Sequence, residues 1–157
     1  MQRIYLDNGA TTFPKPAAVP AAMSDFITNS GVNINRGSYA PAYDTEEKVF
    51  MTRLWLKELF GGSDVKNVIF TQNVTMSLNM VIKGLFGRGD HLLVSEMEHN
   101  AVMRPIMQLE KEGLSFDRLP CHKDGSLILT EMDNYVRPET KAVVMTHASN
   151  VCGTVMP

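Results

Sequence analysis

The sequence predicts an α/β fold in which a mostly parallel sheet is flanked by helices. After about residue 65, short apolar runs suited to buried strands alternate with longer segments of helical periodicity. Strands that alternate with helices form βαβ units, whose strands lie parallel in one sheet. The chain has 157 residues, of which 44% are hydrophobic and 20% charged, so it has the length and composition of a globular domain with one core.

The first part of the chain is predicted to be an arm followed by a helix. Residues 4–6 suit a short strand, and Asp7-Asn8-Gly9 is a turn signal. Pro14 and Pro16 then open a helix, because proline is tolerated in a first turn. Apolar residues recur on one face of that helix, at Val19, Met23, Phe26 and Ile27.

A long helix is predicted next, from Asp44 to about Phe60. Asp44 and Glu47 have the spacing of a capping box, and Gly61-Gly62 ends the helix. Strands are then predicted at Asn67–Phe70, His91–Ser95, Leu114–Leu119 and Lys141–Thr146. Helices are predicted between them, at about Thr75–Phe86, Asn100–Glu112 and Thr130–Tyr135. We expect residues 1–43 to form the N-terminal arm and helix, and residues 44–157 to form the α/β domain.

Ligands of parallel α/β sheets gather beyond the carboxyl ends of the strands. Three segments that follow predicted strands are rich in polar and small residues: 71–75, 96–100 and 147–153. These segments are therefore the candidate binding site.

The first of them leads from a strand into a helix and is a candidate phosphate site. A helix N-terminus presents unpaired N–H groups and a partial positive charge. Thr75 either caps the helix or donates its hydroxyl to a phosphate, and Asn73 tolerates the left-handed backbone of a tight anion-binding turn. A capping threonine without a ligand is the commoner use of such a pattern. The glycine motifs of P-loop NTPases and dinucleotide-binding domains do not occur in the sequence.

The second segment contains His99 directly after a predicted strand. An imidazole at a strand end can stack on a planar cofactor, and the neighbouring Glu96 and Glu98 can orient or charge it. The alternative is a histidine that begins a helix in a polar loop. The four histidines lack the spacing of a metal site.

The third segment offers Asn150, whose amide can contact a ring oxygen of a cofactor, and Gly153, which permits a sharp turn. Cys152 lies between them. Because nothing in the local sequence lowers its pKa, we interpret Cys152 as structural, and with Cys121 as a free thiol.

Together these segments resemble the class V aminotransferase family and, within it, the cysteine desulfurase branch. The similarity extends over nearly the whole chain. It includes Tyr5–Thr12 with Pro14-Lys15-Pro16, Asn35-Arg36-Gly37, Phe70–Thr75 with Asn79, Glu96–Asn100 and His147–Thr154. Asn73 stands where the family usually has glycine.

The resemblance implies part of the large domain of a fold type I enzyme that depends on pyridoxal 5′-phosphate (PLP). Val74 and Thr75 would hold the cofactor phosphate, His99 would stack on the pyridine ring, and Asn150 would contact its phenolic oxygen. The implied substrate is an amino acid, L-cysteine in the desulfurase branch. Its sulfur would pass to an acceptor, as in iron–sulfur cluster assembly, and the complete enzyme would be a homodimer.

The family's later motifs do not occur in these 157 residues. They are an Asp-x-x-Gln segment, a Ser-x-His-Lys segment whose lysine forms the internal Schiff base, and the desulfurase's nucleophilic cysteine and carboxylate-binding arginine. We therefore expect an incomplete, N-terminal portion that contains no catalytic residue and is inactive alone. The alternatives are a non-catalytic product of a truncated or split gene, and another class V activity: selenocysteine lyase, kynureninase-like or aminotransferase.

Charge and hydropathy exclude other partners. A net charge of −2 provides no basic surface for nucleic acid. No apolar run approaches the roughly 20 residues that cross a bilayer, and the first seven residues lack the apolar core of a signal peptide. We expect a cytoplasmic protein without a nucleic-acid or membrane partner.

Overall fold

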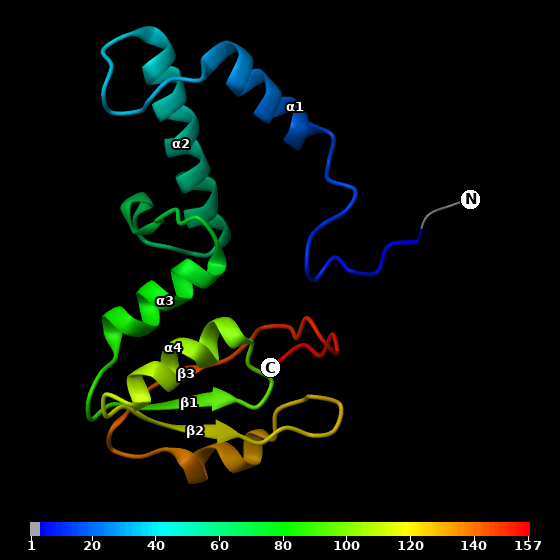
Figure 1. Cartoon of the computed structure of the whole chain (residues 1–157), viewed down its shortest axis with the longest axis vertical. Helices are drawn as coiled ribbons and strands as arrows, with labels where there is room; N and C mark the ends of the chain where they lie inside the picture. The colour runs from blue at the N-terminus through cyan, green and yellow to red at the C-terminus, as the bar shows by residue number, and fades with distance from the viewer. Residues whose placement is uncertain (1–3) are drawn as a thin grey trace. The chain divides into compact units, whose positions relative to one another are not determined.

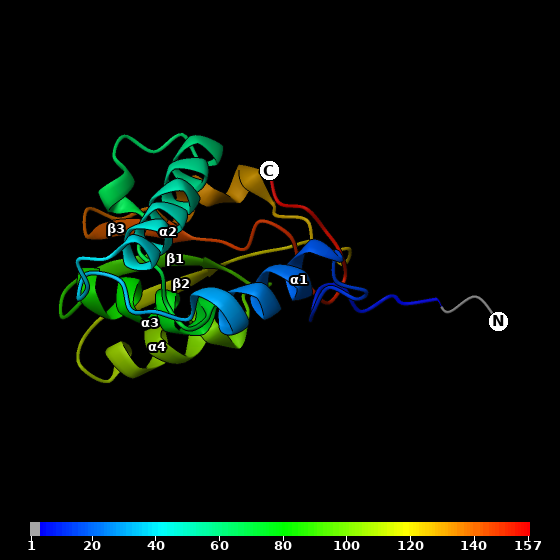
Figure 2. The same ribbon diagram turned by 90° about the horizontal axis from the view of Figure 1, so that it is seen from above.

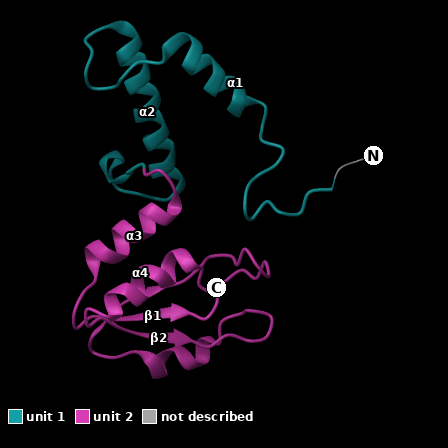
Figure 3. Ribbon diagram, in the orientation of Figure 1, with its two compact units in different colours: residues 1–70 teal, residues 71–157 magenta. Residues whose placement is uncertain are grey.

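The computed structural model describes residues 4–157, so the first three residues of the predicted arm lie outside it. Within the described chain, two compact units meet at the Phe70–Thr71 bond (Figure 3). The division of the sequence after residue 43 stays a prediction.

The arm at the start of the first unit is irregular, and the short strand predicted at residues 4–6 is wrong. The backbone there pairs with no strand in the described residues, and Leu6 is almost fully exposed. Instead, the hydroxyl of Tyr5 donates to the carbonyl oxygen of Thr11 at 2.9 Å, and the Tyr5 ring meets Phe13 edge-on with centroids 5.4 Å apart. Local side-chain contacts thus shape the arm.

Two helices follow the arm, as predicted (Figure 1). They are α1 (Ala18–Asp25), which continues into the π-helical turn η1 (Phe26–Ser30), and α2 (Ala40–Leu59). The capping box predicted at Asp44 is wrong, because α2 begins four residues earlier. Tyr39 is its extended N-cap and Pro41 occupies the first turn, where the missing N–H costs nothing.

The C-terminus of α2 confirms the glycine stop. Gly61 has a φ of 64°, and its N–H donates to the carbonyl of Glu58 at 3.2 Å. The N–H of Gly62 donates to the carbonyl of Lys57 at 2.7 Å. These two bonds form a Schellman motif, which satisfies the last carbonyls of the helix.

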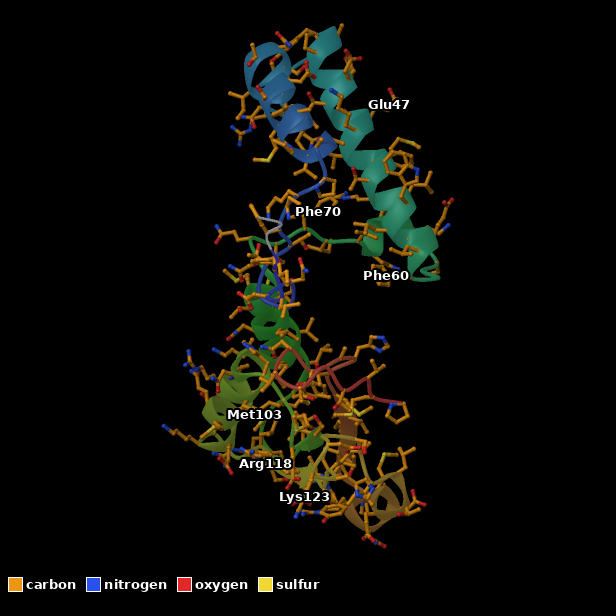
Figure 4. The ribbon with its side chains drawn as sticks, turned by 90° about the vertical axis from the view of Figure 1, so that its right-hand side faces the viewer. Glu47, Phe60, Phe70, Met103, Arg118 and Lys123 are labelled. Carbon is orange, nitrogen blue, oxygen red and sulfur yellow. The ribbon has the colours of Figure 1, made fainter. Side chains whose placement is uncertain are left out.

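The strand predicted at Asn67–Phe70 is also wrong. The turn η2 (Val65–Asn67) occupies its beginning, and the residues after it are not paired with any strand of the described chain. Phe60 and Phe70, labelled in Figure 4, are both exposed on the first unit. An apolar run becomes a strand only where a neighbour completes its hydrogen bonds.

The second unit confirms the predicted parallel sheet. Its elements are α3 (Val74–Leu85), β1 (His91–Ser95), α4 (Asn100–Glu110), β2 (Ser115–Leu119), the 3₁₀ segment η3 (Leu129–Tyr135) and β3 (Thr140–Val144). In the described residues the strand order is β2-β1-β3, with both pairings parallel. Every residue of β1 is buried, as suits the apolar run Leu92–Val94 at the centre of this strand.

Alternate residues of β1 divide the core between the two faces of the sheet. Leu92 and Val94 pack with α3 and α4, which lie along the same side of the sheet (Figure 2). Leu93 packs on the opposite face with Leu119 and Leu127. With both faces covered, the strand ends are held at a common edge.

A polar network connects the first residues of β1 and β3 with Asp117 in the middle of β2. The ring of His91 is fully buried, with Nδ1 2.8 Å from Thr140 Oγ1 on β3 and Nε2 3.3 Å from Asp117 Oδ2 on β2. Asp117 also pairs with Arg137, whose N–H donates to the same threonine hydroxyl at 2.8 Å. These polar side chains therefore make structural contacts between the strands.

Candidate functional site

The carboxyl edge of the sheet and the start of α3 bring three of the four predicted site residues together, namely Val74, Thr75 and His99. Asn73 is the N-cap of α3, and its Oδ1 accepts the N–H of Met76 at 2.9 Å. Its backbone is extended, with a φ of −167°, so the left-handed geometry expected of Asn73 is wrong. Thr71 braces the turn, with its Oγ1 2.9 Å from the carbonyl of Asn73 and 2.6 Å from Ser77 Oγ.

Because Asn73 provides the cap, Thr75 does not. Val74 and Thr75 are the first two residues of α3 and both are exposed. The Thr75 side chain therefore lies beside the unpaired N–H groups of the first turn, in the geometry that suits an anion. Its role as a phosphate ligand stays a prediction.

His99 begins α4, as the alternative interpretation expected. Its Nδ1 accepts the backbone N–H of Ala101 at 3.0 Å, which makes the imidazole the N-cap of the helix. Since Nδ1 accepts, the neutral ring bears its proton on Nε2. The ring is exposed and fixed in orientation, and this leaves it suited to the predicted stacking role.

The expectation that Glu96 and Glu98 orient His99 is wrong. Neither carboxylate is hydrogen-bonded to the imidazole among residues 4–157. Glu96 Oε2 accepts the N–H of Cys121 at 3.0 Å, and Glu98 Oε1 accepts from Ser95 and Thr146. The ring is oriented by its own helix instead.

Two small pockets adjoin His99. The first, of about 240 Å³, is lined by Val74, Glu98, His99 and Thr146 and has an apolar wall of Leu78, Ala101, Val102, Val144 and Met145. The second, of about 220 Å³, is lined by Thr75, Asn79, His99, Asn100, Ala101 and Arg104. Val74 and Thr75 thus each share a pocket with the imidazole of His99, so three of the four predicted cofactor residues lie together.

Asn150 lines neither of these pockets. It is exposed in the turn of a loop closed by a bridge between Ala148 and Val155. Ser149 is buried beneath the turn, and its Oγ accepts the N–H of Val151 at 3.2 Å. The loop starts from Thr146, which does line the first pocket. The contact predicted for Asn150 stays a prediction.

The expectation that nothing lowers the pKa of Cys152 is wrong, and its interpretation as a structural residue stays a prediction. Hydrogen bonds lower the pKa of the exposed Cys152 thiol to about 7, the largest effect coming from the side chain of Ser149 and the next from Thr154. Thr154 Oγ1 lies 3.3 Å from its sulfur. By contrast, burial raises the pKa of Cys121.

Sequence reasoning did not assign Arg104 to the site, and it gave Glu98 a different role, the orientation of His99. Arg104 lies one helical turn after Asn100, so its place beside the second pocket is visible in the spacing once α4 is accepted. Glu98 is placed by its contact with Thr146, 48 residues away, which no local pattern shows.

The residues present fit PLP in kind. A helix start with an adjacent hydroxyl suits the phosphate, and a fixed imidazole beside an apolar wall suits an aromatic ring. A larger depression of about 550 Å³ lies on the first unit, but one helix, α2, supplies all of its lining. In residues 4–157, no three His, Cys, Asp or Glu side chains are grouped as metal ligands. None of the helices described there has both the length and the apolar character needed to span a bilayer.

Known proteins are similar to this chain in sequence and fold. The family model described as aminotransferase class V matches residues 4–157. A cysteine desulfurase IscS from Haemophilus ducreyi is 34% identical over 97% of the chain, and a probable cysteine desulfurase from Halalkalibacterium halodurans is 30% identical over 98%. The apo structure of a cysteine desulfurase from Thermococcus onnurineus superposes with a TM-score of 0.87 at 27% identity, over 98% of the chain. The chain spans 38%, 39% and 38% of these three proteins, respectively.

Proposed function

The chain belongs to the class V aminotransferase family, and from this premise we propose that it is the cofactor-facing part of a PLP-dependent cysteine desulfurase. In this proposal the complete protein takes sulfur from L-cysteine and passes it to an acceptor, and acts as a homodimer. The names of the two curated relatives support the substrate, and residues 44–157 would be part of the large PLP-binding domain.

The observation that carries the proposal is the arrangement around His99. The imidazole is fixed by its bond to Ala101 and lies between one pocket that contains Val74 and another that contains Thr75. A PLP-sized group has a phosphate at one end of a flat ring, so it needs an anion site and a stacking surface close together. The start of α3 and the imidazole of α4 provide that pair.

PLP supplies an electron sink for the bonds that change at the substrate's α-carbon. The protein's own residues bind and orient it. Thr75 and the first N–H groups of α3 would hold the phosphate, His99 would cover one face of the ring, and Asn150 would donate its amide to the phenolic oxygen. Val74 and Val144 would keep water from the ring edge. None of the 157 residues is proposed as catalytic.

The cofactor proposal is tested by titrating the chain with PLP and following its visible absorption. We expect weak binding, with Thr75→Ala and His99→Ala each lowering the affinity roughly ten-fold, because each removes a contact to a charged or aromatic group. Thr130→Ala and His122→Ala are matched controls on exposed positions outside the pockets and should bind as the parent does. Unchanged binding in the Thr75 and His99 variants would show that the site is wrong.

Two further readouts complete the test. We expect no borohydride-stable lysine adduct in this chain, and mass spectrometry that finds such an adduct at one site would contradict the assignment. For the complete polypeptide from its source, we expect sulfide release from L-cysteine. Amino-group transfer without sulfide release would replace desulfurase by another class V activity.

A further inference from the structure

Glu98 joins the carboxyl ends of two adjacent strands. Its side chain is half-buried, and its Oε1 accepts the hydroxyl of Ser95 at 2.7 Å and the backbone N–H of Thr146 at 2.6 Å. Ser95 is the last residue of β1, and Thr146 follows β3 by two residues. One carboxylate oxygen therefore accepts a hydrogen bond from each of the two strand ends.

The contact lies where the backbone pairing of the sheet stops. The ladder between β1 and β3 ends at the pair Val94 and Val144. Beyond that pair, β1 turns toward His99, and the segment after β3 turns toward Asn150. The bonds to Glu98 continue the connection between the two segments past the end of the ladder.

Both ends of this connection belong to the proposed cofactor site. Glu98 and Thr146 line the same pocket as Val74 and His99. His99 is the next residue after Glu98, and Thr146 is the first residue of the loop that presents Asn150. A change at Glu98 would move the imidazole and the asparagine relative to each other.

Glu96 provides a comparison within the same turn. Its carboxylate accepts the N–H of Cys121 at 3.0 Å and so connects the end of β1 to the segment after β2. That segment contains none of the predicted cofactor residues. The two acids thus connect the same turn to opposite neighbours, and only the connection through Glu98 reaches the site.

We infer that Glu98 is a positioning residue that sets the spacing between His99 and the 146–150 segment by accepting hydrogen bonds from both strand ends. The inference rests on the proposed function, because it concerns the cofactor that these residues would bind. Both donors meet one oxygen, so an amide oxygen can replace the carboxylate. Glu98→Gln should therefore keep the two strand ends connected, whereas Glu98→Ala and the shorter Glu98→Asp should lose this connection.

The first experiment needs no cofactor. Amide hydrogen exchange of the full chain should show a protected Thr146 N–H in the parent and in Glu98→Gln. In Glu98→Ala the exchange rate at Thr146 should rise at least roughly ten-fold, since the amide loses its acceptor. An unchanged rate at Thr146 would overturn the inference. If Glu98→Ala does not fold, as circular dichroism would show, the comparison of Glu98→Asp with Glu98→Gln makes the same test.

The second experiment measures PLP affinity in the same variants. We expect a loss of roughly ten-fold for Glu98→Ala and Glu98→Asp, rescue by Glu98→Gln, and no loss for the matched control Glu96→Ala. If Thr75→Ala weakens binding but Glu98→Ala does not, the cofactor site stands and the positioning role is wrong. The exchange rate at Thr146 could instead rise in Glu98→Ala while no Thr75, His99 or Glu98 variant alters PLP binding. In that case both the proposed function and the positioning role are wrong.

Discussion

The thiol of Cys152 shows how two hydroxyls can change the chemistry of a neighbouring residue. Ser149 is buried and Thr154 half-buried, and their hydroxyls lower the pKa of the exposed thiol to about 7. A thiol with that pKa is about half thiolate at neutral pH, and the thiolate is the nucleophilic form. The lowering also stabilises the folded chain above the ordinary pKa of 9.0, and this contribution is lost as pH falls through about 7.

Alkylation by iodoacetamide should therefore distinguish the two cysteines. We expect the rate at Cys152 to rise with a midpoint near pH 7, and the rate at Cys121 to rise only at higher pH because burial disfavours its thiolate. Peptide mass spectrometry across pH 5 to pH 10 measures both rates in one sample. Ser149→Ala should move the Cys152 midpoint upward. Coincident pH profiles for the two thiols would contradict the assignment.

Sequence reasoning also had a clear limit at this scale. Thr75 and His99 were predicted to lie together because the carboxyl ends of parallel strands meet at one edge, and the structure places both in the lining of one pocket. The roles predicted for Asn73 and Glu98 were wrong. The cap made by Asn73 depends on which residue starts the helix, and the bonds of Glu98 depend on a segment 48 residues away.

At the scale of elements, local signals predicted helices better than they predicted isolated strands. The three strands of the sheet were predicted from apolar runs, and each has a neighbour to pair with. The run at 67–70 is also apolar, but it has no partner in the described chain and forms no strand. Strand formation depends on a second segment, whereas a helix completes its own hydrogen bonds.

At the end of α2, the local glycine signal was enough to predict where the helix stops. Gly61 takes a φ of 64°, which an L-residue adopts at a cost, and no atom lies within 4 Å of a Cβ built there. Gly84, near the end of α3, has equally open surroundings without a positive φ. Both sites have room for a side chain, and only Gly61 has a positive φ. Alanine substitutions at the two glycines therefore differ in backbone strain and not in crowding.

We expect Gly61→Ala to lower the free energy of unfolding by about 1 kcal/mol, because alanine is strained in the left-handed region. Gly84→Ala should raise it by about 0.5–1 kcal/mol through the better helix propensity of alanine. Urea denaturation followed by circular dichroism measures both. A stabilising Gly61→Ala would show that the Schellman motif is not formed in solution.

At the scale of the whole molecule, burial is uneven between the two units. The second unit has a core on both faces of its sheet. In the first unit, α2 lies wholly within the described residues, yet of its twenty residues Ala42 and Thr45 alone are buried. Trp55 is 61% exposed and Leu59 is 74% exposed. Apolar surface of this extent favours association in water.

The isolated chain should therefore self-associate. We expect light scattering after size-exclusion chromatography to give a mass above the 17.5 kDa of one chain, increasing with concentration. The double variant Trp55→Glu with Leu59→Glu should shift the chain toward the monomer, because it places charge on the exposed face of α2. Val151→Glu, at an exposed residue of the second unit, is the matched control. A concentration-independent monomer in the parent would contradict this prediction.

The order of strands in the sheet has a consequence for the folding pathway. Contacts between the β1 and β2 segments close loops of about 25 residues, as from Asp90 to Ser115, whereas His91 on β1 and Thr140 on β3 are 49 residues apart. Longer loops cost more entropy to close, and contacts distant in sequence form later. The β1–α4–β2 portion should thus assemble first and β3 dock last. Because Thr146 follows β3, the bond to Glu98 forms only in that final step, and an early intermediate would contain the imidazole of His99 without its partner loop.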